Sequence, residues 1–278
     1  MHTSSNNKSH DTINFIIVGK PNSGKSTLFN NLLKDDISPA GETYGLTKDL
    51  FTEKFRFKNY FFIIHDTPGL RRKNKIDDED EKKRNQKVLK LIEKIDAAIL
   101  LIDATENLTR QDFKIAEIVL RRKKILLVIF NKIDLIDDPV KYKKKINLFL
   151  ENNYSQYKEI NTNYISALSN TKIEGLLGVI IKKMQLSKIK LKKIELNNFI
   201  KKLRTDSRLP KIKNIEVRPK YIVQVESDIL KFKIFINTKN KAPRIFTKFF
   251  DNEFRKFFSL KGVPVAFQFV SSNNPYSG

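Results

Sequence analysis

The sequence predicts an α/β domain built on a doubly wound, mostly parallel sheet of about six strands, followed by a small α+β domain. Short runs of β-branched and aromatic residues alternate with amphipathic runs through the first part of the 278 residues, which is typical of parallel strands joined by crossover helices. A glycine-rich segment directly follows the first apolar run. The charge is also uneven, because residues 1–180 carry +7 and residues 181–278 carry +16 of the net +23. This pattern indicates two domains of different composition.

The first domain is expected to follow a polar leader, residues 1–11, that we expect to be disordered. Its strands are predicted at apolar, β-branched runs, and its helices where apolar residues recur every three and four positions. The expected strands are 13–18, 51–58, 60–65, 97–103, 125–131 and 162–165. The expected helices are 26–34, 81–95, 110–122, 139–152 and 172–184.

The second domain is predicted at residues 194–278, after a first domain at 12–186 and a lysine-rich linker at 187–193. Phenylalanines in its last helix are interspersed with lysines and arginines. Such a helix either packs its aromatic side chains in the core or presents an aromatic and basic surface to nucleic acid, and the helical spacing favours the core. The expected elements are a helix at 194–205, strands at 220–226 and 230–237, a helix at 242–258 and a strand at 264–270.

The composition excludes several classes of protein. No cysteine occurs, which rules out disulfides, thiolate nucleophiles and cysteine-bound zinc and favours a reducing compartment, so we expect a cytoplasmic protein. No segment has the roughly 18–20 uninterrupted apolar residues of a membrane span, and the leader has no apolar core of a secretory signal. The net charge of +23 predicts a polyanionic partner, nucleic acid rather than an anionic membrane surface.

The segment GKPNSGKS, residues 19–26, lies between the first expected strand and the first expected helix and matches the pattern G-x-x-x-x-G-K-[ST]. Its glycines let consecutive backbone amides and the helix N-terminus point at phosphate oxygens. Lys25 is expected to bridge the β- and γ-phosphates, and the Ser26 hydroxyl is expected to bind Mg²⁺. The sequence therefore predicts a phosphate-binding P-loop.

The nucleobase is predicted by the segment NKID, which begins at Asn131 after the fifth expected strand. The Asp134 carboxylate can accept hydrogen bonds from both N1 and N2 of guanine, donors that adenine lacks, so adenine would leave this carboxylate unpaired. Asn131 is expected to tie this loop to the P-loop, and the stem of Lys132 to lie against the base. After the sixth strand, the segment Ser166-Ala167-Leu168 is expected to offer a backbone amide to guanine O6. The predicted ligand is a guanine nucleotide.

A switch loop for the γ-phosphate is predicted at DTPG, which starts at Asp66 after the third expected strand. Asp66 is placed to hold Mg²⁺ through water, and the Gly69 amide to contact the phosphate. A second hydroxyl for Mg²⁺ comes from Thr47 or Thr43. Leu70, which follows Gly69, cannot orient a water molecule as the glutamine of Ras-type enzymes does, so the water must be positioned otherwise. Because no arginine finger is evident, slow intrinsic hydrolysis is expected.

These elements, in this order and spacing, resemble the Era/Der branch of translation-factor-related GTPases. Three segments favour the Der (EngA) family of bacterial ribosome-assembly GTPases: RRKNKI at 71–76, KGVPV at 261–265 and NPY at 274–276. They are similar to the second GTPase domain and the KH-like domain of that family, and the resemblance covers nearly the whole chain. Era is the alternative, but its KH domain has a G-x-x-G loop that clamps RNA, whereas residues 237–241 contain no glycine.

The chain departs from the Der pattern in two ways. Der has two GTPase domains in tandem and this chain has one, so it corresponds to an excised second half, an incomplete sequence or a reduced variant. Pro68 stands where the second domain of Der more often has alanine, a pattern also common in Era. The family pattern favours Thr47 over Thr43, because a Lys-Asp pair follows Thr47. In similar GTPases an asparagine placed like Asn22 goes with activation by K⁺, which stands where the charge of an arginine finger would.

The resemblance implies a GTPase that converts GTP to GDP and phosphate with Mg²⁺, is stimulated by K⁺, and docks on rRNA of the large ribosomal subunit or its precursor. We also expect a monomer. Two alternatives remain open: an Era-like GTPase that acts on small-subunit rRNA, and a GTP-dependent RNA-binding scaffold with negligible hydrolysis.

The expected catalytic residues are Lys25, Thr47 and Gly69. The expected metal ligands are Ser26, Thr47 and Asp66 for Mg²⁺ and Asn22 for K⁺. The expected GTP-binding residues are Gly19, Lys20, Pro21, Asn22, Ser23, Gly24, Lys25, Ser26, Thr27, Asp66, Thr67, Pro68, Gly69, Leu70, Asn131, Lys132, Ile133, Asp134, Ser166, Ala167 and Leu168.

Overall fold

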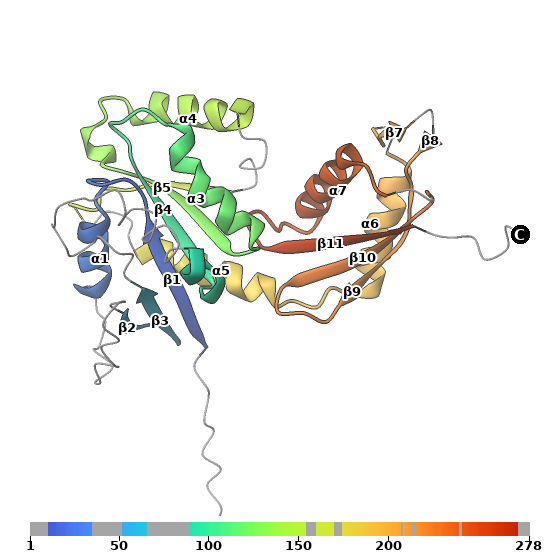
Figure 1. Cartoon of the computed structure of the whole chain (residues 1–278), viewed down its shortest axis with the longest axis horizontal. Helices are drawn as coiled ribbons and strands as arrows, with labels where there is room; N and C mark the ends of the chain where they lie inside the picture. Colours follow the sequence, from blue (N-terminus) through green and yellow to red (C-terminus); the bar gives the residue numbers. More distant parts are fainter. Residues whose placement is uncertain are drawn as a thin grey trace, which may run out of the picture. The chain divides into compact units, whose positions relative to one another are not determined.

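The computed structural model of the chain describes residues 11–34, 52–65, 89–153, 160–169, 174–206, 208–212, 215–238 and 241–271. The chain divides into two compact units, Met1–Ile181 and Lys182–Gly278. Each unit has its own β-sheet with helices packed on it (Figure 1).

The first unit is built on a single sheet with the strands β1 (Thr12–Val18), β2 (Thr52–Phe57), β3 (Tyr60–His65), β4 (Ala97–Asp103), β5 (Ile125–Asn131) and β6 (Asn161–Tyr164). Their order is β2-β3-β1-β4-β5-β6, and all neighbours are parallel except the β2–β3 pair at one edge. Every residue of β4 and β5 is buried. Strands that are apolar on both faces need cover on both sides, as in doubly wound sheets.

The described helices of the first unit include α1 (Lys25–Lys34), α3 (Arg110–Arg121) and α4 (Pro139–Asn153), with a short 3-10 helix, η1 (Ile133–Leu135). Helix α5 (Glu174–Ser187) begins in the first unit and ends in the second. One apolar cluster joins α3 and α4 to the central strands through residues such as Phe113, Ile146 and Phe130. α1 packs on β1. Because the parallel strands point the same way, the loops after β1, β4, β5 and β6 meet at one edge of the sheet.

The second unit contains α6 (Lys193–Arg204), β7 (Lys211–Ile212), β8 (Ile215–Glu216), β9 (Pro219–Val225), β10 (Leu230–Ile236), α7 (Arg244–Phe257) and β11 (Val265–Ser271). The three long strands form a sheet in the order β11-β10-β9, in which β10 is parallel to β11 and antiparallel to β9. Phe246, Phe250 and Phe254 form one face of α7 and are fully buried against Phe199 of α6 and Phe232 of β10. The prediction that the aromatic face of α7 is core is confirmed.

The predicted fold class is confirmed. The predicted elements are present with bounds that differ by up to three residues. Of the predicted helix 81–95, residues 89–94 are helical and 81–88 lie outside the described residues. The β7–β8 pair was not predicted, because two residues on each side are too short to show a periodic pattern.

Part of the expected linker packs within the second unit. Gln224 of β9 accepts a hydrogen bond from the Leu191 amide and donates one to the Ile189 carbonyl, both 2.9 Å long. The side chains of Ile189 and Leu191 also pack against the core of the second unit. This part of the segment is therefore held by β9.

Candidate functional site

The P-loop runs from the end of β1 to the start of α1 in a conformation that requires glycine at two positions. The φ angles of Gly19 and Gly24 are 153° and 93°. A Cβ atom on Gly19 would lie 2.2 Å from the Leu101 carbonyl oxygen, and one on Gly24 would lie 2.2 Å from Nδ2 of Asn131. The P-loop backbone therefore lies directly against β4 and β5, which a larger residue at either position would prevent.

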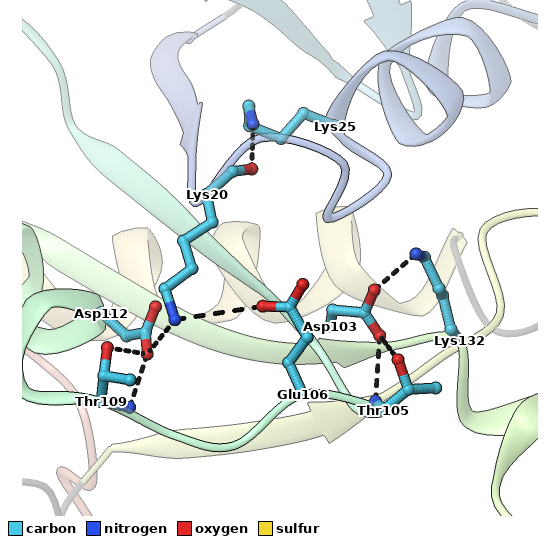
Figure 2. Close-up of polar contacts among 8 residues, drawn as sticks. All are labelled: Lys20, Lys25, Asp103, Thr105, Glu106, Thr109, Asp112 and Lys132. Carbon is cyan, nitrogen blue, oxygen red and sulfur yellow. Dashed lines mark hydrogen bonds and ion pairs between the residues drawn. The ribbon is translucent and has the colours of Figure 1, made fainter.

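Lys25 begins α1, and its ammonium group donates a 2.5 Å hydrogen bond to the Lys20 carbonyl of the same loop (Figure 2). Burial lowers the pKa of Lys25, because a positive charge is costly away from water. A phosphate group beside this ammonium would offset that cost. Ser26 and Thr27 complete the first turn of α1, and Ser26 is exposed, so a hydroxyl group is accessible next to the helix N-terminus.

Asn131, the last residue of β5, joins three loops at the edge of the sheet. The side chain is 2% exposed. Its Nδ2 donates to the Ser23 carbonyl of the P-loop, and its Oδ1 accepts from the Ala167 amide after β6, both at 2.8 Å. Its carbonyl accepts a hydrogen bond from the Ala104 amide after β4, also at 2.8 Å. The predicted tie between the NKID loop and the P-loop is therefore present.

The NKID loop turns sharply after Asn131. Lys132 has a positive φ of 62°, and Ile133 and Asp134 continue into η1. Asp134 is exposed. Its carboxylate therefore faces solvent, where an incoming base can reach it.

The side chain of Lys132 is held by a buried carboxylate. Its Nζ lies 2.5 Å from Oδ2 of Asp103, which ends β4 and is 6% exposed. The other carboxylate oxygen accepts hydrogen bonds from the amide and hydroxyl of Thr105, at 2.9 and 2.7 Å. Burial raises the pKa of Asp103, but the hydrogen bonds from Lys132 and Thr105 outweigh burial and keep this pKa below its ordinary value. Asp103 is therefore ionised at neutral pH and fixes the position of the Lys132 ammonium.

The side chain of Lys20 points from the P-loop toward the connection between β4 and α3 (Figure 2). Its Nζ lies 3.0 Å from Oδ2 of Asp112 and 4.0 Å from Oε2 of Glu106. The same Asp112 oxygen accepts hydrogen bonds from the amide and hydroxyl of Thr109, at 2.7 and 2.8 Å, and the bond from the amide belongs to the capping box of α3. The β4–α3 connection therefore contacts the P-loop at one end and the NKID loop at the other.

The loop after β6 is anchored on both sides. Ser166 and Ala167 are buried, whereas Leu168 is 84% exposed. The Ala167 carbonyl accepts a 2.5 Å hydrogen bond from Nδ2 of Asn31 in α1. The Ala167 amide already donates to Asn131. A backbone amide that binds guanine O6 therefore either belongs to a neighbouring residue or is that of Ala167 after it has given up its bond to Asn131.

Several of the predicted site residues lie outside the described residues. Among the described residues, no group of three or more His, Cys, Asp or Glu side chains is arranged to hold a metal ion. Of the three predicted Mg²⁺ ligands, Ser26 is the one within the described ranges. The residues outside them are Thr43, Thr47, Asp66, Thr67, Pro68, Gly69 and Leu70.

Sequence reasoning missed Asp103, Glu106 and Asp112, which contact two of the predicted loops. Two signals were available for them. Asp103 is the last residue of a buried strand, as Asn131 is. The T-x-x-D spacing of Thr109 and Asp112 is typical of a capping box, which places a carboxylate in the first turn of α3.

Comparison with known proteins identifies both domains. Residues 14–132 match the family described as 50S ribosome-binding GTPase, and residues 190–269 match the KH-domain-like family of EngA bacterial GTPase enzymes, C-terminal. The chain carries the GTPase and KH-like domains of the Der (EngA) family. The predicted resemblance and the predicted P-loop GTPase fold are thus confirmed.

Relatives of known identity are similar along nearly the whole chain. GTPase Der of Finegoldia magna is 33% identical over 270 residues, which are 95% of this chain and 61% of that protein. GTPase Der of Rickettsia prowazekii is 29% identical over 269 residues, 96% of this chain and 60% of that protein. The chain thus spans about three fifths of the length of these relatives. Among solved structures, Era of Aquifex aeolicus bound to GDP·AlF4⁻ is 21% identical, with a TM-score of 0.48 over 94% of this chain and 93% of that one.

The described helices of the Der-type chain include none that is both long enough and apolar enough to span a membrane.

Proposed function

We propose that this Der-type chain is a GTP-binding and GTP-hydrolysing switch that docks on the large ribosomal subunit or its precursor. The observation that carries the proposal is the bonding of Asn131, which links the P-loop, the NKID loop and the loop after β6 through one buried side chain. These are the loops that contact phosphate and base in a P-loop nucleotide site. As part of the proposal, the GTPase domain is residues 12–186, the linker 187–193 and the KH-like domain 194–278.

Guanine selectivity is assigned to the exposed carboxylate of Asp134. A carboxylate pairs with the N1 and N2 donors of guanine and would stay unpaired opposite adenine. The stem of Lys132, whose ammonium is fixed by Asp103, would lie along the base. Guanine nucleotides are therefore expected to bind far more tightly than adenine nucleotides.

The hydrolytic step needs positioning and charge neutralisation more than covalent chemistry. Lys25 would bridge the β- and γ-phosphates, and the Gly69 amide would contact the γ-phosphate. The exposed Ser26 hydroxyl fits a Mg²⁺ ligand, with Thr47 as a second ligand and Asp66 acting through water. When bound, Mg²⁺ neutralises charge on the β- and γ-phosphate oxygens. Stimulation by K⁺ at Asn22 belongs to the same proposal.

Association with rRNA is supported by charge and by the matched families. The description of the first matched family names 50S ribosome binding, and residues 181–278 carry +16 of the net charge. Lysine and arginine contacts to phosphates release counterions, so this association is expected to weaken steeply with salt.

The experiment that tests this proposal compares the full chain with Lys25→Ala. Release of inorganic phosphate from GTP is measured for both proteins, alone and with purified large or small ribosomal subunits. We expect slow release by the unaltered chain, faster release with large subunits, and none above background for Lys25→Ala. Equal release by both proteins would favour the RNA-binding scaffold, and stimulation by small subunits alone would favour the Era-like function.

A further inference from the structure

The sheet of the KH-like domain has one covered and one open face. Residues of β10 alternate between buried and half-buried along the whole strand. The buried set, Leu230, Phe232, Ile234 and Ile236, packs with α6 and α7 in the core. The alternate residues Lys231, Lys233 and Phe235 therefore lie on the other face.

Strand register identifies the neighbours of these three residues. Opposite Lys231, Lys233 and Phe235, β9 places Val225, Val223 and Tyr221, and β11 places Ala266, Gln268 and Val270. Of the residues on this face, Tyr221 is 47% and Val223 is 38% exposed. We call these nine residues the open face.

An aromatic pair and two lysines give the open face its chemistry. The rings of Tyr221 and Phe235 are stacked, with centroids 4.1 Å apart and planes at 14°. Lys231 and Lys233 lie on the same strand as Phe235, at successive outward positions. None of the nine residues is acidic. A surface of partly exposed aromatic and basic side chains without carboxylates complements a strand whose bases stack and whose phosphates carry negative charge.

We propose that the open face binds a single-stranded segment of RNA, with a base stacking on the Tyr221–Phe235 pair and phosphates contacting Lys231 and Lys233. The inference rests on the proposed association with rRNA and names the surface and the form of RNA. Single-stranded RNA is favoured over a duplex because unstacked bases are free to lie on aromatic rings. It is favoured over a protein partner because every charged group on the face is positive, in a part of the chain that carries +16.

The test measures binding of the full chain to a fluorescently labelled single-stranded RNA of about 12 nucleotides, within the usual size of single-strand sites, and to the same sequence as a duplex. Tyr221→Ala is expected to weaken single-strand binding by at least about fivefold, which is the lower end of the effect of removing one base–aromatic stack. Tyr221→Phe is expected to restore most of that affinity, because it keeps the ring. Neither substitution should change GTP affinity.

A matched pair of charge variants tests the placement of the phosphates. The double substitution Lys231→Ala and Lys233→Ala removes two charges from the open face, whereas Lys201→Ala with Lys248→Ala removes two exposed charges from α6 and α7. Only the first pair should flatten the dependence of log affinity on log salt, by roughly 0.7 for each phosphate that is no longer neutralised. Tyr221→Ala should leave this slope unchanged.

The outcomes separate this inference from the proposed function. If the unaltered chain binds neither RNA nor ribosomal subunits, both the rRNA association and the open-face site are wrong. If it binds RNA but Tyr221→Ala is as tight as the unaltered chain, or the two lysine pairs behave alike, the RNA site lies elsewhere and the open-face proposal is overturned. Tighter binding to the duplex than to the single strand would assign the open face to duplex RNA. A change of sedimentation coefficient in Tyr221→Ala without RNA would assign it to protein contacts. Either result would overturn the open-face proposal.

Discussion

The buried carboxylate of Asp103 and the ammonium group of Lys132 form an ion pair of 2.5 Å between the end of β4 and the NKID loop. Asp103 and Asn131 are paired in register on adjacent strands, so the residue that holds the lysine is fixed beside the loop that contains it. Asp103 and Lys132 are 29 positions apart in the sequence, but the parallel sheet places them at the same edge.

Asp103→Asn is expected to weaken GDP binding about tenfold, or about 1.4 kcal/mol, because the Lys132 side chain loses the charge that positions it. Lys132→Met should have a similar effect. Because the two residues act as one unit, the double variant should be little weaker than either single variant. Isothermal titration with GDP for all four proteins checks this, and additive losses would contradict it. IDP, which lacks the N2 group, should show the same loss, since the pair does not read that group.

Replacing Lys20 and Asp112 should separate the contribution of the α3 capping box to stability from that of the ion pair. Asp112→Ala removes both the ion pair to Lys20 and the capping box of α3, so we expect a loss of about 1–2 kcal/mol in the free energy of unfolding. Lys20→Met removes the cation beside the buried carboxylate but leaves the two hydrogen bonds from Thr109 in place, so it should cost less stability than Asp112→Ala. Urea unfolding of both variants measures the difference. An equal loss in the two would show that the capping box contributes nothing.

Gly24→Ala is expected to weaken GTP binding more than 100-fold, or more than about 2.7 kcal/mol, because the added Cβ would lie 2.2 Å from Nδ2 of Asn131 and φ is 93°. A matched control is Gly178→Ala in α5, where an added Cβ meets nothing within 4 Å. That helical substitution should raise stability by roughly 0.5–1 kcal/mol and leave nucleotide affinity alone. Fluorescence titration with a labelled GTP analogue checks both variants.

Replacing K⁺ by Na⁺ is expected to cut the rate of GTP hydrolysis several-fold while GTP affinity stays nearly constant, because the cation would act on charge that develops during the reaction. Asn22→Ala should remove the difference between the two salts. Phosphate release at equal ionic strength measures the effect. Equal rates in both salts for the unaltered chain would contradict the role of K⁺.

Lys183 in α5 is predicted to make stability rise with pH in the alkaline range. It is buried, and its ammonium donates a 2.7 Å hydrogen bond to the Lys261 carbonyl. Burial, and then the positive charges of Lys261, Arg255 and Lys182, lower its pKa to about 8. Between that value and the ordinary pKa of 10.5, the unfolded chain binds more protons than the folded chain, so the free energy of unfolding increases as pH rises.

The comparison for Lys183 is Lys183→Met, which keeps the length of the side chain and removes the titrating group. The difference in the free energy of unfolding between the unaltered chain and this variant should shift in favour of the unaltered chain from about pH 8 to about pH 10. Urea unfolding across this range measures it. A constant difference would show that Lys183 has the same pKa in the folded and the unfolded chain.

The sequence predicted the elements of both domains because each carries its own periodic signal. The apolar runs of β4 and β5 and the apolar face of α7 are local patterns, and they are present as predicted. The link between Asn131 and the P-loop was also predictable, because P-loops and the ends of parallel strands meet at one edge of the sheet.

The contacts of Asp103 and Asp112 were not predicted, because they depend on three-dimensional placement. Nothing in the sequence indicates that the side chain of Lys20 turns toward α3 instead of toward the nucleotide. That choice depends on the distance from the P-loop to the buried carboxylate of Asp112, which only the packed sheet defines. The open face of the second sheet was likewise missed, since the alternation in β10 shows two faces but does not say which is covered.

The hydrogen bonds of Gln224 to Ile189 and Leu191 bear on how the KH-like domain can be studied in isolation. A fragment cut at the end of the predicted linker would lose three apolar side chains that pack against its core, Leu186, Ile189 and Leu191, and both partners of the half-buried Gln224 amide. A fragment that starts at Lys182 would keep them, together with the bond from Lys183 to the loop before β11. Expression trials of the second domain should therefore begin about a dozen residues before its first complete helix.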